Sequence, residues 1–228
     1  MIGSSTILRA IVVSLLAISI VAASAPTSSG QGVFVVAPDS RPFGQSYGDW
    51  SAHWWQWVMS LEPEVNPQLD NSGSRCGNGQ SGPVWFLAGN YGGSTTRTCT
   101  VPANTALFYP VVNALCWKPD DGETEEELRA CGAGLIDLAT ALASEVDGAP
   151  VAGLENYRVR SPMFSFTLPG TDDRNISNLG PPLEREGVAD GVWVLLSPLP
   201  VGPHVVHIHA EVPEIEIIID VTYNLTVR

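Results

Sequence analysis

Two histidines near the C-terminus have the spacing of a metal-binding pair. His207 and His209 point to the same face of an extended strand, because successive side chains alternate between the two faces. A hairpin that turns at residues 210–213 places Glu214 opposite His209 on this face. The same register places Glu216 opposite His207. Imidazole and carboxylate groups are ligands for zinc and copper, and the alternative interpretation is a cross-strand charge ladder.

A second candidate lies in a Trp-rich segment, where four polar residues recur at steps of four, three and four. They are Asp49, His53, Gln56 and Ser60. On a helix they share one face, and Asp49 can accept a hydrogen bond from His53 one turn later. A carboxylate partner raises the basicity of an imidazole, as in a general base. This pair, or a carboxylate from the loop at 170–190, predicts a secreted hydrolase. The alternative is an ordinary solvated helix face.

Aromatic side chains with polar neighbours form a third candidate, because exposed aromatic rings stack on sugar rings. The aromatic candidates are Trp55, Trp85 and Trp117, and the polar neighbours are Gln80, Asn90 and Asn113. Trp55 lies off the main apolar stripe of its helix, and the other two tryptophans lie in or near loop-rich segments. The alternative is that these aromatic residues belong to the core.

The four cysteines predict two disulfide bonds, because none of them has the Cys-x-x-Cys spacing of a zinc ligand pair. Three pairings are possible. We expect Cys76 with Cys99 and Cys116 with Cys131, because each of these pairs closes a local loop. Disulfides persist in oxidising compartments, so we expect a secreted, periplasmic or cell-surface protein. A thiolate metal site is the alternative.

The N-terminal segment has the features of a signal peptide. Arg9 precedes an apolar stretch over residues 10–21, and small residues follow it. We expect cleavage after Ala23, which leaves residues 24–32 as a flexible leader. The alternative is an uncleaved membrane anchor, although this stretch is shorter than the roughly 20 apolar residues of a membrane-spanning helix. We expect no membrane span after cleavage.

The composition bounds the partners. The 228 residues include 24 acidic and 11 basic residues, for a net charge of −13. This charge repels phosphate backbones and anionic membrane surfaces, so nucleic-acid binding is excluded as an interpretation. No pattern in the sequence predicts a cofactor.

Two helices are expected, over about 47–61 and 125–146. In the first, Tyr47, Trp50, Trp54, Trp57 and Leu61 form one apolar stripe, and Ser46 with Asp49 forms a capping box. In the second, the stripe is Leu128, Cys131, Leu135, Leu138 and Leu142, and Thr124 with Glu127 forms the capping box. We expect Gly148 to end the second helix.

The remaining pattern is that of strands, with loops at 62–82 and 170–190. Strands are expected at Val33–Val36, Val84–Ala88, Thr98–Val101, Ala106–Val112, Phe164–Leu168, Val192–Leu196, His204–Ala210 and Ile215–Val227. In the last hairpin we expect Ile215, Ile217 and Ile219 to point inward. The sequence therefore predicts a mainly β protein, an antiparallel β-sandwich with two covering α-helices, as a single domain over residues 33–228.

Four segments resemble those of an uncharacterised family of exported bacterial proteins. They lie at residues 47–57, 79–89, 190–196 and 222–227, and the first two carry the patterns YGxWSAxWWQW and GQSGPVWFLAG. The resemblance runs from about Val33 to the C-terminus. It implies export and a single domain, and it implies no activity.

Three functional hypotheses follow from these features. The first is an exported binding or structural domain of the cell envelope or extracellular space, with a glycan or a partner protein as ligand. The second is the hydrolase with Asp49 and His53, and the third is the metal-binding protein with His207 and His209. The sequence does not decide whether the protein is an enzyme.

Overall fold

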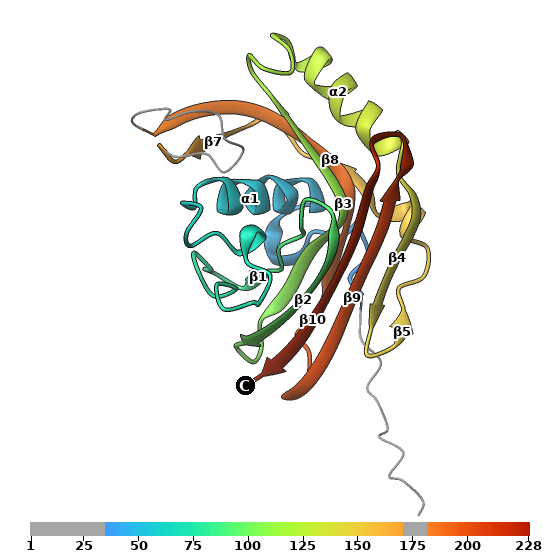
Figure 1. Ribbon diagram of the computed structural model, residues 1–228. Coiled ribbons are helices and arrows are strands. Elements are labelled where there is room, and N and C mark those ends of the chain that lie inside the picture. The colour runs from blue at the N-terminus through green and yellow to red at the C-terminus, as the bar shows by residue number, and fades with distance from the viewer. Residues whose placement is uncertain (1–34, 171–181) are drawn as a thin grey trace, which may run out of the picture. The chain divides into compact units, whose positions relative to one another are not determined.

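The computed structural model describes residues 35–170 and 182–228 (Figure 1). The described residues group into one compact unit. The predicted signal peptide and leader lie outside the described residues, as does the middle of the loop predicted at 170–190. No helix in the described part of the chain is long and apolar enough to cross a bilayer.

Strands dominate the fold, as predicted. The two α-helices are α1 (Tyr47–Met59) and α2 (Glu125–Asp137). The strands are β1 (Val84–Phe86), β2 (Gly93–Val101), β3 (Ala106–Trp117), β4 (Thr140–Val146), β5 (Ala149–Pro150), β6 (Arg158–Arg160), β7 (Phe164–Leu168), β8 (Leu183–Leu196), β9 (Gly202–Val212) and β10 (Ile217–Val227). Several strands are longer than predicted, and β8 begins inside the expected loop.

The strands form two mixed sheets, which corrects the prediction of purely antiparallel pairing. One sheet has the order β1-β3-β8-β6, with β7 also paired to β8, and the other has the order β2-β10-β9-β4-β5. β1 runs parallel to β3, and β2 runs parallel to β10. The chain passes from β1 into the other sheet as β2 and returns as β3, so β3 enters its sheet in the direction of β1. Hydrophobic alternation within a strand does not report such a crossing.

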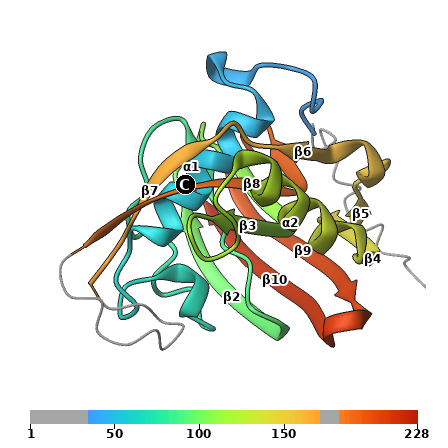
Figure 2. The same cartoon turned by 90° about the horizontal axis from the view of Figure 1, so that it is seen from above.

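Helix α1 covers one face of the β3–β8 sheet, and the second sheet lies against the opposite face of that sheet (Figure 1). The view from above shows β9 and β10 side by side, with β2 next to β10 (Figure 2). Side chains of both sheets, including Val194, Val206 and Val221, share one buried cluster. A second cluster joins α1 to the sheet, where Phe108 and Trp193 stack with ring centroids 5.2 Å apart.

Helix α1 begins as predicted. The Ser46 hydroxyl accepts a hydrogen bond from the Asp49 backbone N–H, and the Asp49 carboxylate accepts one from the Ser46 N–H at 2.8 Å. The apolar stripe from Tyr47 to Trp57 is buried. The helix ends at Met59, so Leu61 lies beyond it.

The second helix is shorter than predicted. Its capping box is present, but it ends at Asp137, and Thr140–Val146 is strand β4, paired with β9. The apolar residues after Asp137 continue the helical spacing by coincidence. Asp147 and Gly148 both have positive φ, at 53° and 78°, and they join β4 to β5. An Asp-Gly pair between strands is typical of a tight hairpin, and that signal was assigned to a helix end.

Both predicted disulfides are confirmed. Cys76 pairs with Cys99 and Cys116 pairs with Cys131, with Cα atoms 6.1 and 6.3 Å apart. The first bond fastens the loop after α1 to β2, and the second fastens α2 to β3.

The register predicted for the β9–β10 hairpin is wrong. Val212 pairs with Ile217 and the turn is residues 213–216, so the turn lies three residues later than expected. Pro213 begins the turn, and Glu216 ends it with φ 56°. Each residue of β9 therefore pairs with a residue six positions further along β10 than predicted, as His207 does with Thr222 in place of Glu216. A shift of six is even, so the inward and outward faces are as predicted. Ile215 is the exception, because it lies in the turn and is 47% exposed.

Candidate ligand-binding site

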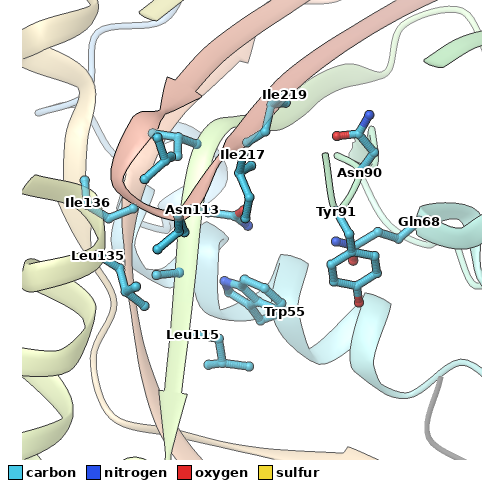
Figure 3. Close-up of a pocket in the computed structure, with 14 residues that line it drawn as sticks. Trp55, Gln68, Asn90, Tyr91, Asn113, Leu115, Leu135, Ile136, Ile217 and Ile219 are labelled. Carbon is cyan, nitrogen blue, oxygen red and sulfur yellow. The ribbon is translucent and has the colours of Figure 1, made fainter. Parts of the chain in front are cut away.

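A cavity of about 230 Å³ lies at the open edge of β3. β1 pairs with β3 only as far as Phe108, and no other described strand continues the sheet on that side. Figure 3 shows Trp55 near the centre of this pocket. Leu135 and Ile136 of α2 lie on one side, and Gln68, Asn90 and Tyr91 lie on the other. The hairpin residues Val212, Ile215, Ile217 and Ile219 complete the lining.

A β-bulge in β3 turns the side chain of Asn113 toward the cavity. The register with β8 shifts between Pro110 and Val112, and Val111 and Val112 both lie in the cluster shared by the two sheets. After the bulge the alternation is inverted, so Leu115 joins the cluster around α1. Asn113 lies two residues before Leu115 and so points to the same face of the strand, which places the Asn113 amide on the side of α1.

Three buried polar atoms belong to residues that line this cavity and have no hydrogen-bond partner within the described part of the chain. They are Trp55 Nε1, Gln68 Oε1 and Asn113 Nδ2. The other unpaired buried atoms of the described residues are Trp85 Nε1, Arg185 Nε and Trp193 Nε1, whose residues are not among those that line the cavity. Burial of a polar atom without a partner costs about 1–3 kcal/mol, and three of these six atoms belong to residues of one cavity.

The wall that carries Gln68 is held rigidly by a buried arginine. Arg97 is 1% exposed and donates hydrogen bonds to the backbone carbonyls of Gln68, Ala88 and Gly89. It also donates to the Tyr223 hydroxyl at 2.8 Å. Burial raises the pKa of this tyrosine, which keeps it a neutral hydroxyl at physiological pH. The loops on this side are therefore fixed before any ligand arrives.

The mouth of the cavity is apolar and uncharged. Tyr91, Leu135 and Ile215 are 52%, 38% and 47% exposed, and all three line the cavity. No Asp, Glu, Lys or Arg is among its lining residues. A smaller hollow of about 110 Å³ shares Trp55, Tyr91 and Leu115 with it. The site suits a neutral, largely apolar molecule.

No protein-family model matches this chain, nor does any curated protein or any solved structure. The chemistry of the site is therefore the basis for a functional conclusion.

The structure separates the predicted glycan-binding residues. Trp55 lines the cavity and Trp117 lines the smaller hollow beside it. Gln80 instead hydrogen-bonds the backbone of Cys76 and Phe86 and so holds a turn. Trp85 is half-buried against the core. None of the three tryptophans is an exposed aromatic platform, since Trp55 and Trp117 are buried and Trp85 is half-buried. A Trp at helical or strand spacing is more often packed.

The predicted pair of Asp49 and His53 is not joined by a hydrogen bond in the described structure. Hydrogen bonds from the Ser46 hydroxyl and backbone hold the pKa of Asp49 below its usual range. The carboxylate is thus engaged at the start of α1. His53 Nδ1 lies 3.1 Å from Gln56 Oε1 instead.

The predicted metal ligands are not brought together as expected. His207 Nε2 lies 2.8 Å from Asp220 Oδ1, and Glu214 and Glu216 lie in the turn of the hairpin. Hydrogen bonds from Ser94 and then from His207 lower the pKa of Asp220. His209 Nε2 lies 3.4 Å from Glu211 Oε1.

Among the described residues, only Cys116, Asp121 and Cys131 gather three ligand atoms that could hold a metal, and both sulfurs are in a disulfide. The histidine face has the form of a cross-strand ladder.

Three contributors to the cavity were missed at the level of sequence. Gln68 lies in a loop without a pattern, and Leu135 was assigned to the buried stripe of a helix. Ile215 was placed inside a strand. Three other lining residues, Trp55, Asn90 and Asn113, were among the aromatic and polar candidates named from the sequence.

Proposed function

We propose that this chain is an exported binding protein that holds a small, uncharged and largely apolar ligand in the cavity beside Trp55. The proposal rests on one observation: an apolar cavity whose lining residues carry three buried polar atoms without partners. A ligand with matching groups would satisfy those atoms, whereas a purely structural domain gains nothing from leaving them unpaired. Export is supported by the two disulfides and by the resemblance to exported bacterial proteins.

The donors and acceptors define the ligand further. Trp55 Nε1 and Asn113 Nδ2 are donors and require an acceptor, and Gln68 Oε1 requires a donor. A hydroxyl group serves both needs. The cavity volume of about 230 Å³ exceeds the roughly 150 Å³ of an engineered cavity that binds benzene. We therefore propose a ring-sized or short branched alcohol, or the hydroxyl-bearing end of a longer apolar molecule.

In this proposal the two sheets act as the layers of a β-sandwich, and the site lies where α1, α2 and the β9–β10 turn meet one sheet edge. The rigid parts are the sheets and the loops fastened by Arg97 and Cys76. The hydrolase hypothesis has less support, because the Asp49 carboxylate is occupied by the capping box.

A matched set of small probes tests the proposal. Cyclohexanol offers a donor and an acceptor, cyclohexanone an acceptor alone, methylcyclohexane neither, and cyclohexanecarboxylate a charge. We expect cyclohexanol to bind best and the carboxylate least, followed through the indole N–H resonance of Trp55. Gln68→Leu should reduce the preference for cyclohexanol over cyclohexanone.

The control is Gln80→Leu, because Gln80 is an amide of the same size whose contacts lie outside the cavity. It should leave the order of affinities unchanged. Equal binding of all four probes, or no perturbation of Trp55 by any of them, would refute the proposed site.

A further inference from the structure

The two sequence patterns that stand out in this chain meet in one groove. The groove has a volume of about 450 Å³ and lies between the polar side of α1 and the turn at residues 79–83. His53, Gln56 and Ser60 come from the helix, and Ser81 comes from the turn. The chain between α1 and β1 runs beside the helix (Figure 1). This groove shares no lining residue with the cavity beside Trp55.

The hydrogen bonds of Gln56 fix the tautomer of His53. Gln56 Nε2 donates to the backbone carbonyl of Ser165 at 2.9 Å, so the amide oxygen must be the atom that faces His53. An amide oxygen only accepts, so His53 Nδ1 carries the proton. In the neutral ring, Nε2 is then the acceptor, and it is the nitrogen that this contact leaves available to a ligand. Gln56 is thus a positioning residue for the imidazole.

The rest of the groove combines hydroxyls with aromatic rings. Ser60 and Ser81 are exposed hydroxyls, and Trp50, Trp57 and Phe86 form the apolar side. Both indole N–H groups are already paired, with the carbonyls of Pro42 and Asn78. The tryptophans therefore contribute apolar surface. The Ser60 hydroxyl donates to the Trp57 carbonyl, and the Gln56 amide bonds Ser165 and His53. The groups left for a ligand are the Ser81 hydroxyl, the Ser60 oxygen as an acceptor, and His53 Nε2.

We infer that this groove binds a neutral saccharide, with His53 Nε2 accepting a hydrogen bond from a sugar hydroxyl. Sugars present hydroxyls on their rim and C–H groups on their faces, which matches this mixture of polar and aromatic groups. No carboxylate, lysine or arginine lines the groove, and the chain carries a net charge of −13. Acidic saccharides are disfavoured for that reason.

The test uses the mature chain with three neutral disaccharides: maltose, cellobiose and N,N′-diacetylchitobiose. We expect at least one to bind and to shift the indole N–H resonances of Trp50 and Trp57. His53→Phe keeps a ring but removes the acceptor, and it should weaken that binding about tenfold. The exposed position of His53 makes the variant safe for folding. Trp55→Phe is the matched control and should bind the disaccharide as the native chain does.

The tautomer gives a second readout. In ¹H–¹⁵N spectra of the neutral His53 ring, we expect the proton on Nδ1, and Gln56→Leu should populate the other tautomer and weaken saccharide binding. The inference is overturned if none of the three disaccharides binds, if His53→Phe binds as well as the native chain, or if the proton is on Nε2. If the native chain binds a disaccharide but not cyclohexanol, the result counts against the cavity alone. If it binds cyclohexanol but no disaccharide, the result counts against the groove alone.

Discussion

Trp55 and Trp57 allow a direct test of the unpaired indole nitrogen beside the cavity. Both side chains lie on α1 and both are 7% exposed. Trp57 Nε1 donates to the Asn78 carbonyl at 2.9 Å, whereas Trp55 Nε1 has no partner within the described residues. Replacement of either residue by Phe removes the same atoms, so the loss of buried ring is similar in the two variants.

The difference between the variants therefore reports the hydrogen bond. Trp57→Phe deprives the Asn78 carbonyl of its donor, which costs about 1–3 kcal/mol. Trp55→Phe removes a donor whose unpaired burial already costs about 1–3 kcal/mol in the native protein. We expect Trp57→Phe to be less stable than Trp55→Phe by about 2–6 kcal/mol, the sum of these two effects.

The assay is urea unfolding of the mature chain with both disulfides intact, followed by circular dichroism because the substitutions alter fluorescence. Equal slopes against urea would show that the two variants expose the same surface on unfolding. Cyclohexanol should raise the midpoint of the native chain and of Trp57→Phe, and leave that of Trp55→Phe unchanged. If Trp55→Phe is as destabilised as Trp57→Phe, the indole N–H of Trp55 is paired in solution and the reasoning fails.

Three further predictions concern the scaffold. Burial acts to raise the pKa of Asp70, but hydrogen bonds from its loop outweigh it and lower the pKa to about 2. A lowered carboxyl pKa stabilises the fold above the unfolded pKa, so about 2 kcal/mol should be lost as the pH falls from about 4 to 2. Asp70→Asn should remove this acid limb from the unfolding free energy, and an unchanged limb contradicts the assignment. Asp190→Ala should destabilise by about 3 kcal/mol, because the buried Asp190 carboxylate accepts two hydrogen bonds from Arg158; a loss below about 1 kcal/mol by urea unfolding would show a solvated pair. Replacement of Cys116 and Cys131 together by Ala should cost about 3 kcal/mol, since their bond closes a loop over a separation of 15 residues, and an unchanged melting temperature would oppose this.

Local signals predicted the start of each helix and both disulfides. The capping residues Ser46 and Thr124 are read from three or four neighbouring positions, so no long-range information is needed. The shared face of His207 and His209 in β9 was also predicted, because alternation depends only on the strand itself.

The register of a strand pair and the length of a helix depend on contacts between distant segments, and the predictions of both were wrong. The apolar residues around Leu142 fit a helix by spacing, yet the strand pairing with β9 overrides that pattern. The hairpin turn moved because Val212 gains a partner in Ile217 when the turn begins at Pro213. A register shift by an even number of residues keeps the same side chains on the buried face. The hydrophobic pattern alone therefore cannot choose between the two registers.

The candidate site depends on both kinds of information. The concentration of tryptophan in residues 47–57 marks the region, but the role of each residue follows from the partner of its indole N–H. Trp54 donates to the Leu87 carbonyl at 3.0 Å, and Trp50 and Trp57 also donate to backbone carbonyls. Trp55 is the only tryptophan of α1 whose N–H lacks a partner among the described residues, and it is the one that lines the cavity.

A buried indole that serves packing alone gains stability from a backbone partner, as the other three do. The position of Asn113, the other unpaired donor, depends on the bulge in β3, which no local sequence pattern specifies. Two donors from different elements belong to residues of one apolar cavity, and neither has an acceptor among residues 35–170 and 182–228. The proposed ligand would supply that acceptor.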